Sequence, residues 1–307
     1  MKKLILLIIL ATFCISANSA PRKVTLAAVG DVLLTRGCGK QIARHGADWL
    51  FDKTRDTLKS ADLAFCNLEC PLSTRGVAQK RRFLFRADPK LASSLHANGF
   101  DVVSLANNHT LDYGRDAMLD TIDAVRKANM MPIGAGKNRA DALSVRVVKR
   151  NGLRVGFAAY TDMPSFSVVP LPDKPTIAGL DTGTLPKEIK AAKSRCDVLV
   201  VSVHWGSEYM KIPTERQKTI AHLCIDSGAD LILGHHPHVL QPLEVYKGKP
   251  IAYSMGGFIW DYRARDADMS AIYLFELGKS SARLAKTVPI RIVGCQPRLK
   301  TPKLVGH

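Results

Sequence analysis

Three histidines stand close together in the second half of the chain: His235, His236 and His238. They follow an aliphatic segment at residues 229–233 that is typical of a short buried strand. Neutral imidazole is the commonest metal ligand in proteins, and two imidazoles one residue apart can converge on one ion. Pro237 restricts the backbone between the last two of them. A polar surface loop explains an isolated pair of this kind equally well, so the interpretation depends on the rest of the chain.

Polar side chains follow four other predicted strands in the same way. Aliphatic segments at residues 24–29, 61–65, 101–105 and 197–203 each predict a strand. The polar residues that come after them are Asp31, Asn67 and Glu69, Asn108 and His109, and His204. Helical patterns are found between the strands at residues 48–60, 89–97, 114–128, 187–195 and 214–227. Because repeated strand–loop–helix units align parallel strands, we expect these polar side chains to meet at one edge of the fold.

These groups combine carboxylate, amide and imidazole ligands. Mixed nitrogen and oxygen ligation of this kind suits a divalent transition metal (Mn, Fe or Zn) better than Ca or Mg. These candidate ligands are more than one four-coordinate ion uses, which indicates two ions bridged by a carboxylate. Two such ions can generate a hydroxide near neutral pH and stabilise charge on a phosphoryl oxygen. The residues therefore predict a metal-dependent hydrolytic centre.

The first 20 residues have the pattern of a secretory signal peptide. Lys2 and Lys3 precede an apolar stretch that is short for a membrane span, and small residues end it at Ser19 and Ala20. We expect cleavage near Ser19 and Ala20 and an exported protein in the periplasm or at the cell surface. An uncleaved N-terminal anchor is the alternative. A main domain at residues 21–280 is then followed by a C-terminal strand and basic tail at residues 281–307.

The chain is strongly basic. Its formal net charge is +17, and loss of Lys2 and Lys3 with the signal peptide leaves +15. This balance favours an acidic partner, such as an anionic polymer, a membrane surface or phosphate groups. The sequence contains no helix-turn-helix, zinc-finger or RNA-binding pattern, so nucleic acid is not the expected partner.

Three segments outside the polar loops bear on binding and shape. The basic segment at residues 79–86 predicts either a strand with one buried aromatic face or an anion-binding rim in which Arg86 holds a carboxylate or phosphate. Asn151-Gly152 predicts a type I′ hairpin. The proline-rich residues 163–186 predict a long loop, either a lid or a specificity insertion.

The C-terminal part is expected to complete the sheet. Edge strands are predicted at residues 251–260 and 271–277, a further strand at 283–292, and a loose tail at 297–307. The cysteines that follow the signal peptide are Cys38, Cys66, Cys70, Cys196, Cys224 and Cys295. An even number permits disulfides, including a local Cys66–Cys70 pair, but does not establish them.

Six motifs in a fixed order resemble the CapA family, which is named for capsule and poly-gamma-glutamate synthesis and is related to the calcineurin-like metallophosphoesterases. They are GDVLLTR at 30–36, NLECPLS at 67–73, ANNH at 106–109, HWGSEY at 204–209, GADLILGHHPHVLQP at 228–242 and YSMGGFIWD at 253–261. The resemblance covers residues 24–262 and implies a metallophosphatase-like four-layer α/β/β/α sandwich, with the site above its two central sheets.

The resemblance also implies roles for individual residues. The implied metal ligands are Asp31 and His238 for a first ion, Glu69 as the bridge, and Asn108, His204 and His236 for a second ion. His109 would be the general acid at the leaving group. Near this centre, the candidates for substrate contact are Asn67, Arg86, Trp205 and Glu208.

Three positions depart from the patterns that the resemblance supplies. Leu33 stands where the phosphoesterases have a His two residues after the first Asp, and Asn67-Leu68-Glu69 replaces an Asp-based second motif. Within the CapA pattern, Gly257 stands where an Asn usually follows the first Gly. The first ion site is therefore expected to be weak, singly occupied or retuned.

The leading hypothesis is an exported CapA-type protein that acts in the synthesis or export of an anionic surface polymer, with a metal-dependent hydrolase-like site. The polymer would be poly-gamma-glutamate or an acidic polysaccharide, and membrane-bound synthesis or export subunits would be partners. One alternative is a non-catalytic polymer-binding export module; another is a periplasmic metallophosphoesterase of small phosphate esters. Replacing His109 separates an enzyme from a binding module, because the loss of a general acid abolishes turnover and leaves polymer affinity unchanged.

Overall fold

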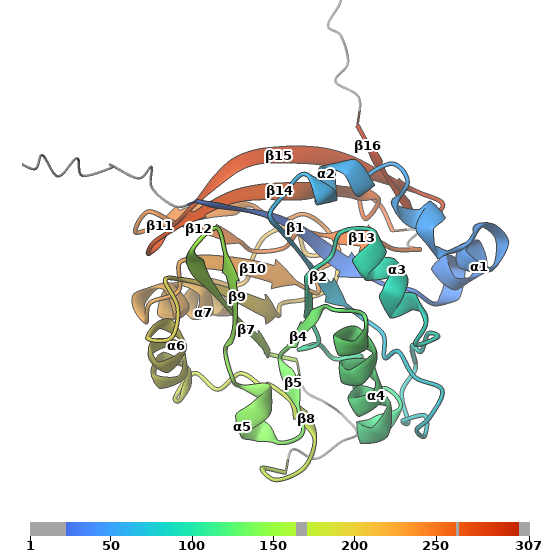
Figure 1. The fold of residues 1–307 in the computed structure, drawn as a ribbon, viewed down its shortest axis with the longest axis horizontal. Helices are drawn as coiled ribbons and strands as arrows, with labels where there is room; N and C mark the ends of the chain where they lie inside the picture. Colours follow the sequence, from blue (N-terminus) through green and yellow to red (C-terminus); the bar gives the residue numbers. More distant parts are fainter. Residues whose placement is uncertain (1–22, 164–170, 262–263, 301–307) are drawn as a thin grey trace, which may run out of the picture.

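Two β-sheets lie face to face at the centre of the molecule (Figure 1). The computed structural model describes residues 23–163, 171–261 and 264–300. The first sheet has the order β16 (Gln296–Leu299), β15 (Ser281–Val293), β14 (Met269–Gly278), β1 (Val24–Val32), β2 (Leu63–Leu68), β3 (Val102–Ser104) and β4 (Met131–Ile133). A short strand, β13 (Gly257–Ile259), also pairs with β1. Strands β1 to β4 are parallel, as strand–loop–helix units require.

The second sheet is built from the middle of the chain. Its order is β11 (Leu243–Tyr246), β12 (Lys249–Ala252), β10 (Leu231–His235), β9 (Val198–His204), β7 (Leu153–Thr161) and β6 (Arg146–Arg150). Two short strands, β5 (Ala135–Gly136) and β8 (Thr176–Ile177), pair separately. The β6–β7 hairpin turns at Asn151 and Gly152, both with positive φ, which confirms the predicted type I′ turn.

Helices cover the outer faces of both sheets, so the molecule has four layers (Figure 1). Those on the first sheet are α1 (Arg36–His45), the 3-10 helix η1 (Ala47–Phe51), α2 (Arg55–Lys59), α3 (Leu91–Ala97) and α4 (Gly114–Lys127). Those on the second sheet are α5 (Arg139–Ala142), α6 (Leu185–Lys193) and α7 (Glu215–Asp226). The predicted α/β/β/α sandwich is therefore confirmed.

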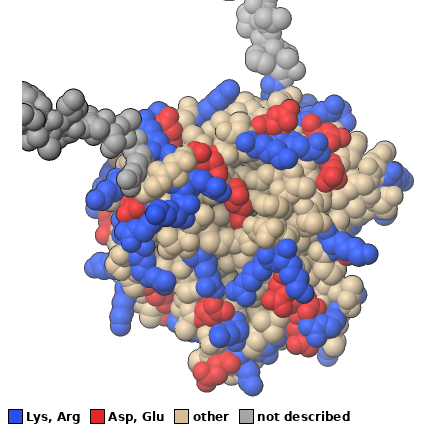
Figure 2. Space-filling model, in the orientation of Figure 1, with Lys and Arg blue, Asp and Glu red and all other residues tan. Residues whose placement is uncertain are grey.

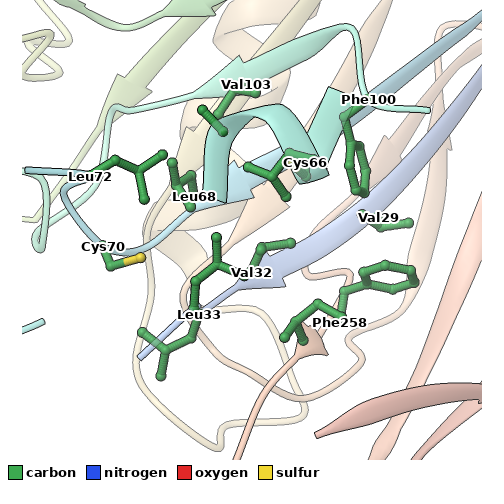
Figure 3. Packing of buried hydrophobic residues seen from close by; sticks show 14 of the residues in the cluster. Val29, Val32, Leu33, Cys66, Leu68, Cys70, Leu72, Phe100, Val103 and Phe258 are labelled. Carbon is green, nitrogen blue, oxygen red and sulfur yellow. The ribbon is translucent and has the colours of Figure 1, made fainter. Parts of the chain in front are cut away.

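Three apolar clusters hold the layers together, because the central strands are buried on both faces. Along β1, Ala27 and Val29 face the helices, whereas Leu26 and Ala28 face the second sheet. Figure 3 shows part of the helix-covered cluster of the first sheet, where Leu33 points into the apolar core. Alternating burial on two faces explains why these strands appear in the sequence as continuous aliphatic segments.

Five predicted segments differ in the structure. Residues 48–60 form η1 and α2 in place of one helix, because a turn closed by Thr54 N–H and Phe51 O interrupts them. The predicted edge strand 251–260 is divided between β12, which lies between β10 and β11 and is not an edge strand, and the short strand β13. The segment 271–277 lies in β14, which pairs with both β1 and β15 and is not an edge strand. Residues 79–86 form no strand, and residues 296–299 form β16 instead of a loose tail. Part of the proline-rich segment, residues 164–170, lies outside the described residues.

Within the described part of the chain, no helix has the length and apolar character needed to cross a bilayer. The predicted signal peptide lies outside the described residues.

Candidate metal centre

Asp31 and Asn67 lie side by side because β1 and β2 are parallel and pair at these two residues. Glu69 follows β2 directly, and its N–H donates a hydrogen bond to Val32 O at 2.9 Å. All three side chains are fully buried. Another backbone segment crosses this strand end, since the Asp31 N–H donates to Gly256 O at 3.0 Å. A Cβ atom at Gly30 would lie 1.8 Å from that oxygen, so the crossing requires glycine.

The second sheet supplies the histidines. His204 ends β9 and His235 ends β10, and these two residues are paired in register. His236 and His238 follow with φ values of 95° and 57°, in the left-handed region that non-glycine residues seldom occupy. A backbone of this kind costs on the order of 1–3 kcal/mol per residue and is concentrated at functional sites. The loop after β10 is therefore held in an unfavourable conformation that turns its imidazoles toward the first sheet.

One group of potential ligands converges between the two sheets. Asp31, Glu69 and His238 each offer a ligand atom, and these atoms lie within 4.8 Å of one another. His238 Nδ1 lies 2.8 Å from Asp31 Oδ2, and His235 Nδ1 lies 3.3 Å from Asp31 Oδ1. Among the described residues, Glu69 Oε2 has no hydrogen-bond partner although it is buried.

The two carboxyl groups differ in their electrostatics. Burial by itself raises the pKa of Asp31, but the hydrogen bond with His238 and the nearby His235 imidazole overcome this effect and hold that pKa well below its usual value. The pKa of Glu69 is raised well above its usual value by burial and by the negative charge of Asp31. Two buried carboxylates this close repel each other, and a cation between them would relieve the repulsion.

A second group lies beside the first. His204 Nε2 is 2.9 Å from Asn108 Oδ1, and the His204 and His236 rings are 4.8 Å apart between centroids. Burial and, to a smaller extent, neighbouring histidines together lower the pKa of His236 to about 3 and that of His204 well below its usual value. Both imidazoles are therefore neutral at pH 7, the form that ligates metals. Within the described chain, the buried His236 Nδ1 also has no hydrogen-bond partner.

Asn67 sits between the two groups as a donor. Its Nδ2 donates to Asp31 Oδ1 at 2.8 Å and to Glu69 Oε1 at 3.2 Å. Its Oδ1 accepts a hydrogen bond from Asn107 Nδ2 at 3.1 Å. Asn107 in turn accepts from His109 N–H at 3.0 Å, which links the second and third motifs. Asn67 is thus oriented to position the carboxylates, and its predicted substrate contact stays a prediction.

His109 belongs to a buried polar chain that we did not foresee from the sequence. Its Nδ1 lies 2.8 Å from Asp112 Oδ2, and Arg81 Nη1 donates to Asp112 Oδ1 at 2.6 Å. The Phe85 ring stacks on the His109 ring at 4.0 Å between centroids. Burial lowers the pKa of His109, and Asp112 opposes that shift. The Asp three residues after the predicted acid was the available signal for this pair, but Asp is also a common turn residue.

The other candidates for substrate contact occupy different surroundings. Trp205 is fully buried in the cluster under α6 and α7, and its indole N–H donates to Tyr253 O at 2.9 Å. This position leaves no exposed face for a substrate. Arg86 and Glu208 are exposed, and the Arg86 guanidinium lies 4.0 Å from the centre of the Tyr113 ring.

The residues at this centre fit a divalent metal. They offer carboxylate oxygens, an amide oxygen and neutral imidazoles. Two of their buried polar atoms, Glu69 Oε2 and His236 Nδ1, have no hydrogen-bond partner in the described chain. The structure brings Asp31, Glu69 and His238 into one group, and Asn108, His204 and His236 into an adjoining one. The division of these six residues between two ions stays a prediction.

Together these features define a class: an α/β/β/α sandwich whose polar centre lies over the carboxyl ends of parallel strands from both sheets. The fold is similar to that of a hypothetical protein from Thermus thermophilus, with a TM-score of 0.53 and 16% sequence identity over 86% of this chain and 97% of that chain. The family model of the bacterial capsule synthesis protein PGA_cap matches residues 25–262, and the chain belongs to this family.

Relatives support the same assignment. The chain is 33% identical to the capsule biosynthesis protein CapA of Bacillus anthracis, over 92% of this chain and 71% of that protein. It is 32% identical to the PGA biosynthesis protein CapA of Bacillus subtilis, over 88% of this chain and 72% of that protein. The resemblance found in the six motifs is thereby confirmed.

Proposed function

We propose that this chain is an exported accessory protein of capsule or poly-gamma-glutamate synthesis, with a metal-dependent hydrolase-like site. Membership of the PGA_cap family and the names of the two Bacillus relatives support the polymer context. The observation that carries the catalytic part is the buried group of Asp31, Glu69 and His238, in which Glu69 Oε2 has no hydrogen-bond partner among the described residues. An ionised carboxylate buried in this state is costly unless a cation neutralises it.

The residues of the chain would divide the chemical work as follows. Asp31, Glu69 and His238, with Asn108, His204 and His236 beside them, would hold divalent transition metal, as one ion or two. Bound metal supplies positive charge that stabilises the negative charge developing on an acyl or phosphoryl oxygen. Asp112 holds the Nδ1 side of His109, so the other nitrogen, Nε2, is the one able to exchange a proton with a reacting group. Arg81 Nη1 donates to the other carboxylate oxygen of Asp112, Oδ1, and so helps to hold Asp112 against His109.

The surface chemistry agrees with an acidic substrate. The formal net charge is +17, and Figure 2 shows Lys and Arg side chains spread over the face in view, with acidic side chains among them. Near His109, the Arg36 guanidinium lies 5.6 Å from the centre of the Phe85 ring. Cationic groups close to the reacting position would attract an anionic polymer by long-range electrostatics.

The test combines metal content with turnover. The purified mature chain would be analysed for transition metals and incubated with poly-gamma-glutamate and with an aryl phosphate, and polymer length and phosphate release would be followed. We expect bound metal and turnover in the wild type, and loss of both in the His236→Ala/His238→Ala double variant. His109→Ala should keep the metal and lose about 10²–10⁴-fold in rate. His222→Ala is the matched control, because His222 lies in α7 and contacts Glu244 of β11, outside the metal centre.

A non-catalytic polymer-binding role is the second candidate, and the strongly basic charge favours it. It predicts polymer affinity that falls steeply with salt concentration and is unchanged in His109→Ala. A wild-type protein that stays free of metal after reconstitution and still binds the polymer would refute the hydrolytic proposal and support this one.

A further inference from the structure

Arginine and aromatic side chains alternate in a row that ends at His109. The Arg82 guanidinium lies 5.1 Å from the centre of the Phe83 ring. The Arg36 guanidinium lies 6.0 Å from the centre of the Phe83 ring and 5.6 Å from that of the Phe85 ring. Phe85 in turn stacks on His109, with 4.0 Å between ring centroids. Each guanidinium is thus within cation–π range of the rings beside it.

Exposure to solvent falls along this row. Arg82 is exposed and the Phe83 ring is 53% exposed. The Arg36 side chain is 39% exposed, whereas Phe85 and His109 are buried. Phe83 belongs to none of the three apolar clusters of the described chain, so its ring is not explained by core packing. The outer end of the row is therefore open to a ligand, and the inner end reaches the residue predicted to transfer a proton.

A second set of contacts connects Arg36 with the metal centre. Arg36 Nε lies 3.3 Å from Asp261 Oδ2, and the same oxygen accepts a hydrogen bond from Gly37 N–H at 2.9 Å. Trp260, the residue before Asp261, stacks on His238 with 4.2 Å between ring centroids. Arg36 therefore reaches the centre by a route that is independent of the phenylalanine rings.

Both guanidinium groups keep donors for a ligand. Arg36 uses Nε for Asp261, and its two terminal nitrogens make no hydrogen bond within the described chain. Arg82 makes neither an ion pair nor a hydrogen bond in the same part of the chain. A guanidinium stacked on an aromatic ring still presents N–H groups at its edge, where a carboxylate can pair with two of them.

The other two arginines of residues 79–86 are engaged elsewhere. Arg81 Nη1 lies 2.6 Å from Asp112 Oδ1 in the buried pair described above. The Arg86 guanidinium lies 4.0 Å from the centre of the Tyr113 ring, outside the row. Arg82 is therefore the arginine of this segment that belongs to the row.

We propose, on the basis of the acidic polymer substrate proposed above, that Arg82, Phe83 and Arg36 form an entry subsite for a polymer with a carboxylate on each repeat of an aliphatic backbone. Each guanidinium pairs with the carboxylate of one repeat. The exposed Phe83 ring between them packs against the methylene groups of the polymer. The polymer then passes Phe85 and presents its next bond at His109. A single small anion gains less from this subsite, because it can pair with only one guanidinium at a time.

The test measures binding and does not depend on turnover. The full mature chain would be reconstituted with Mn²⁺, checked for bound metal, and titrated calorimetrically with a γ-linked glutamate oligomer. Arg36→Gln and Arg82→Gln should each weaken binding about 10-fold and leave the metal content unchanged, because each removes charged hydrogen bonds to a carboxylate. Phe83→Ala should weaken binding about threefold. Arg44→Gln is the matched control, since it removes the same charge from the exposed last turn of α1.

Three results would overturn the proposal, and they differ in what they leave standing. If the Arg36→Gln/Arg82→Gln double variant binds the oligomer as tightly as Arg44→Gln does, the subsite is wrong and the proposed function stands. If the metal-loaded wild type binds no oligomer, the polymer substrate is wrong and the subsite falls with it. If inorganic phosphate binds as tightly as the oligomer and is lost in the same variants, the site takes single anions.

Arg82→Gln keeps the test decisive if Arg36→Gln is unstable. Loss of Arg36 also removes the contact with Asp261, which joins α1 to the segment after β13. Arg82 makes no ion pair or hydrogen bond in the described chain, so its replacement should leave the melting temperature unchanged.

Discussion

Replacing Asp112 by Asn should destabilise the protein much more than replacing His109 by Gln. Asp112 is fully buried and takes part in three hydrogen bonds, with Arg81 at 2.6 Å, Phe85 N–H at 2.8 Å and His109 at 2.8 Å. Asparagine removes the negative charge and presents an N–H group to one of these donors. Breaking a buried ion pair costs about 3–5 kcal/mol. Because the Arg81 side chain is 13% exposed, we expect a cost at the low end of this range, about 3 kcal/mol. His109→Gln loses one hydrogen bond, about 1 kcal/mol.

Urea and thermal unfolding measure this difference directly. A loss of about 3 kcal/mol corresponds to a fall in melting temperature of about 6–12 °C for a domain of this size. The matched control is Asp120→Asn, because Asp120 also pairs with an arginine, Arg75, whose side chain is 63% exposed. That exposed pair should contribute less than about 1 kcal/mol.

The same variants separate structural from catalytic loss. Both Asp112→Asn and His109→Gln should lower turnover, whereas Asp112→Asn alone should lower stability strongly. If Asp112→Asn unfolds at the same urea concentration as Asp120→Asn, the reasoning that the buried Arg81–Asp112 pair holds the His109 loop in place is wrong.

Three further predictions follow from single observations. Thr214→Ala should cost about 1 kcal/mol in urea unfolding, because Thr214 caps α7 in a reciprocal pair with Gln217, and Ser should restore most of it. EDTA should lower the melting temperature of the wild type by several degrees through loss of bound metal, and should leave His236→Ala/His238→Ala unchanged. In the metal-free protein the folded pKa of His236, about 3, lies below its unfolded value, so stability should fall as pH drops from about 6.5 toward 3. His236 should contribute at most about 1.4 kcal/mol per pH unit to the slope of the unfolding free energy. The slope of the whole protein should therefore be smaller in His236→Ala, and unfolding measured across pH checks this.

The sequence was sufficient to locate the strands and their polar ends, because doubly buried parallel strands appear as aliphatic segments with a polar residue where each strand stops. Helix α4 and the Asn151-Gly152 turn were predicted for local reasons and are confirmed. Helix α1 was not predicted, since glycines at 37 and 39 lower its helix propensity and tertiary contacts such as Gly37–Asp261 compensate.

The contacts between motifs could not be derived in this way. Arg81 and Asp112 are 31 residues apart and meet because Asp112 accepts hydrogen bonds from the segment that carries Arg81 and Phe85. The same contacts explain why residues 79–86 form a loop, since one of their backbone N–H groups bonds a carboxylate instead of a neighbouring strand. No spacing or periodicity in the sequence encodes this pairing, which depends on the tertiary fold.

Leu33 shows how the structure accommodates a departure from the phosphoesterase pattern. Its side chain is fully buried in the helix-covered apolar cluster (Figure 3). The imidazole expected near Asp31 comes instead from the second sheet, where His235 Nδ1 lies 3.3 Å from Asp31 Oδ1. His235 lies outside the group that converges within 4.8 Å, and its ring centroid is 5.7 Å from that of Phe65 in the core between the sheets. His235 is therefore placed to favour the ionised form of Asp31. A further metal ligand would have to lie close to Glu69 and His238 as well. This argues for a first metal site with fewer protein ligands than the phosphoesterase pattern provides.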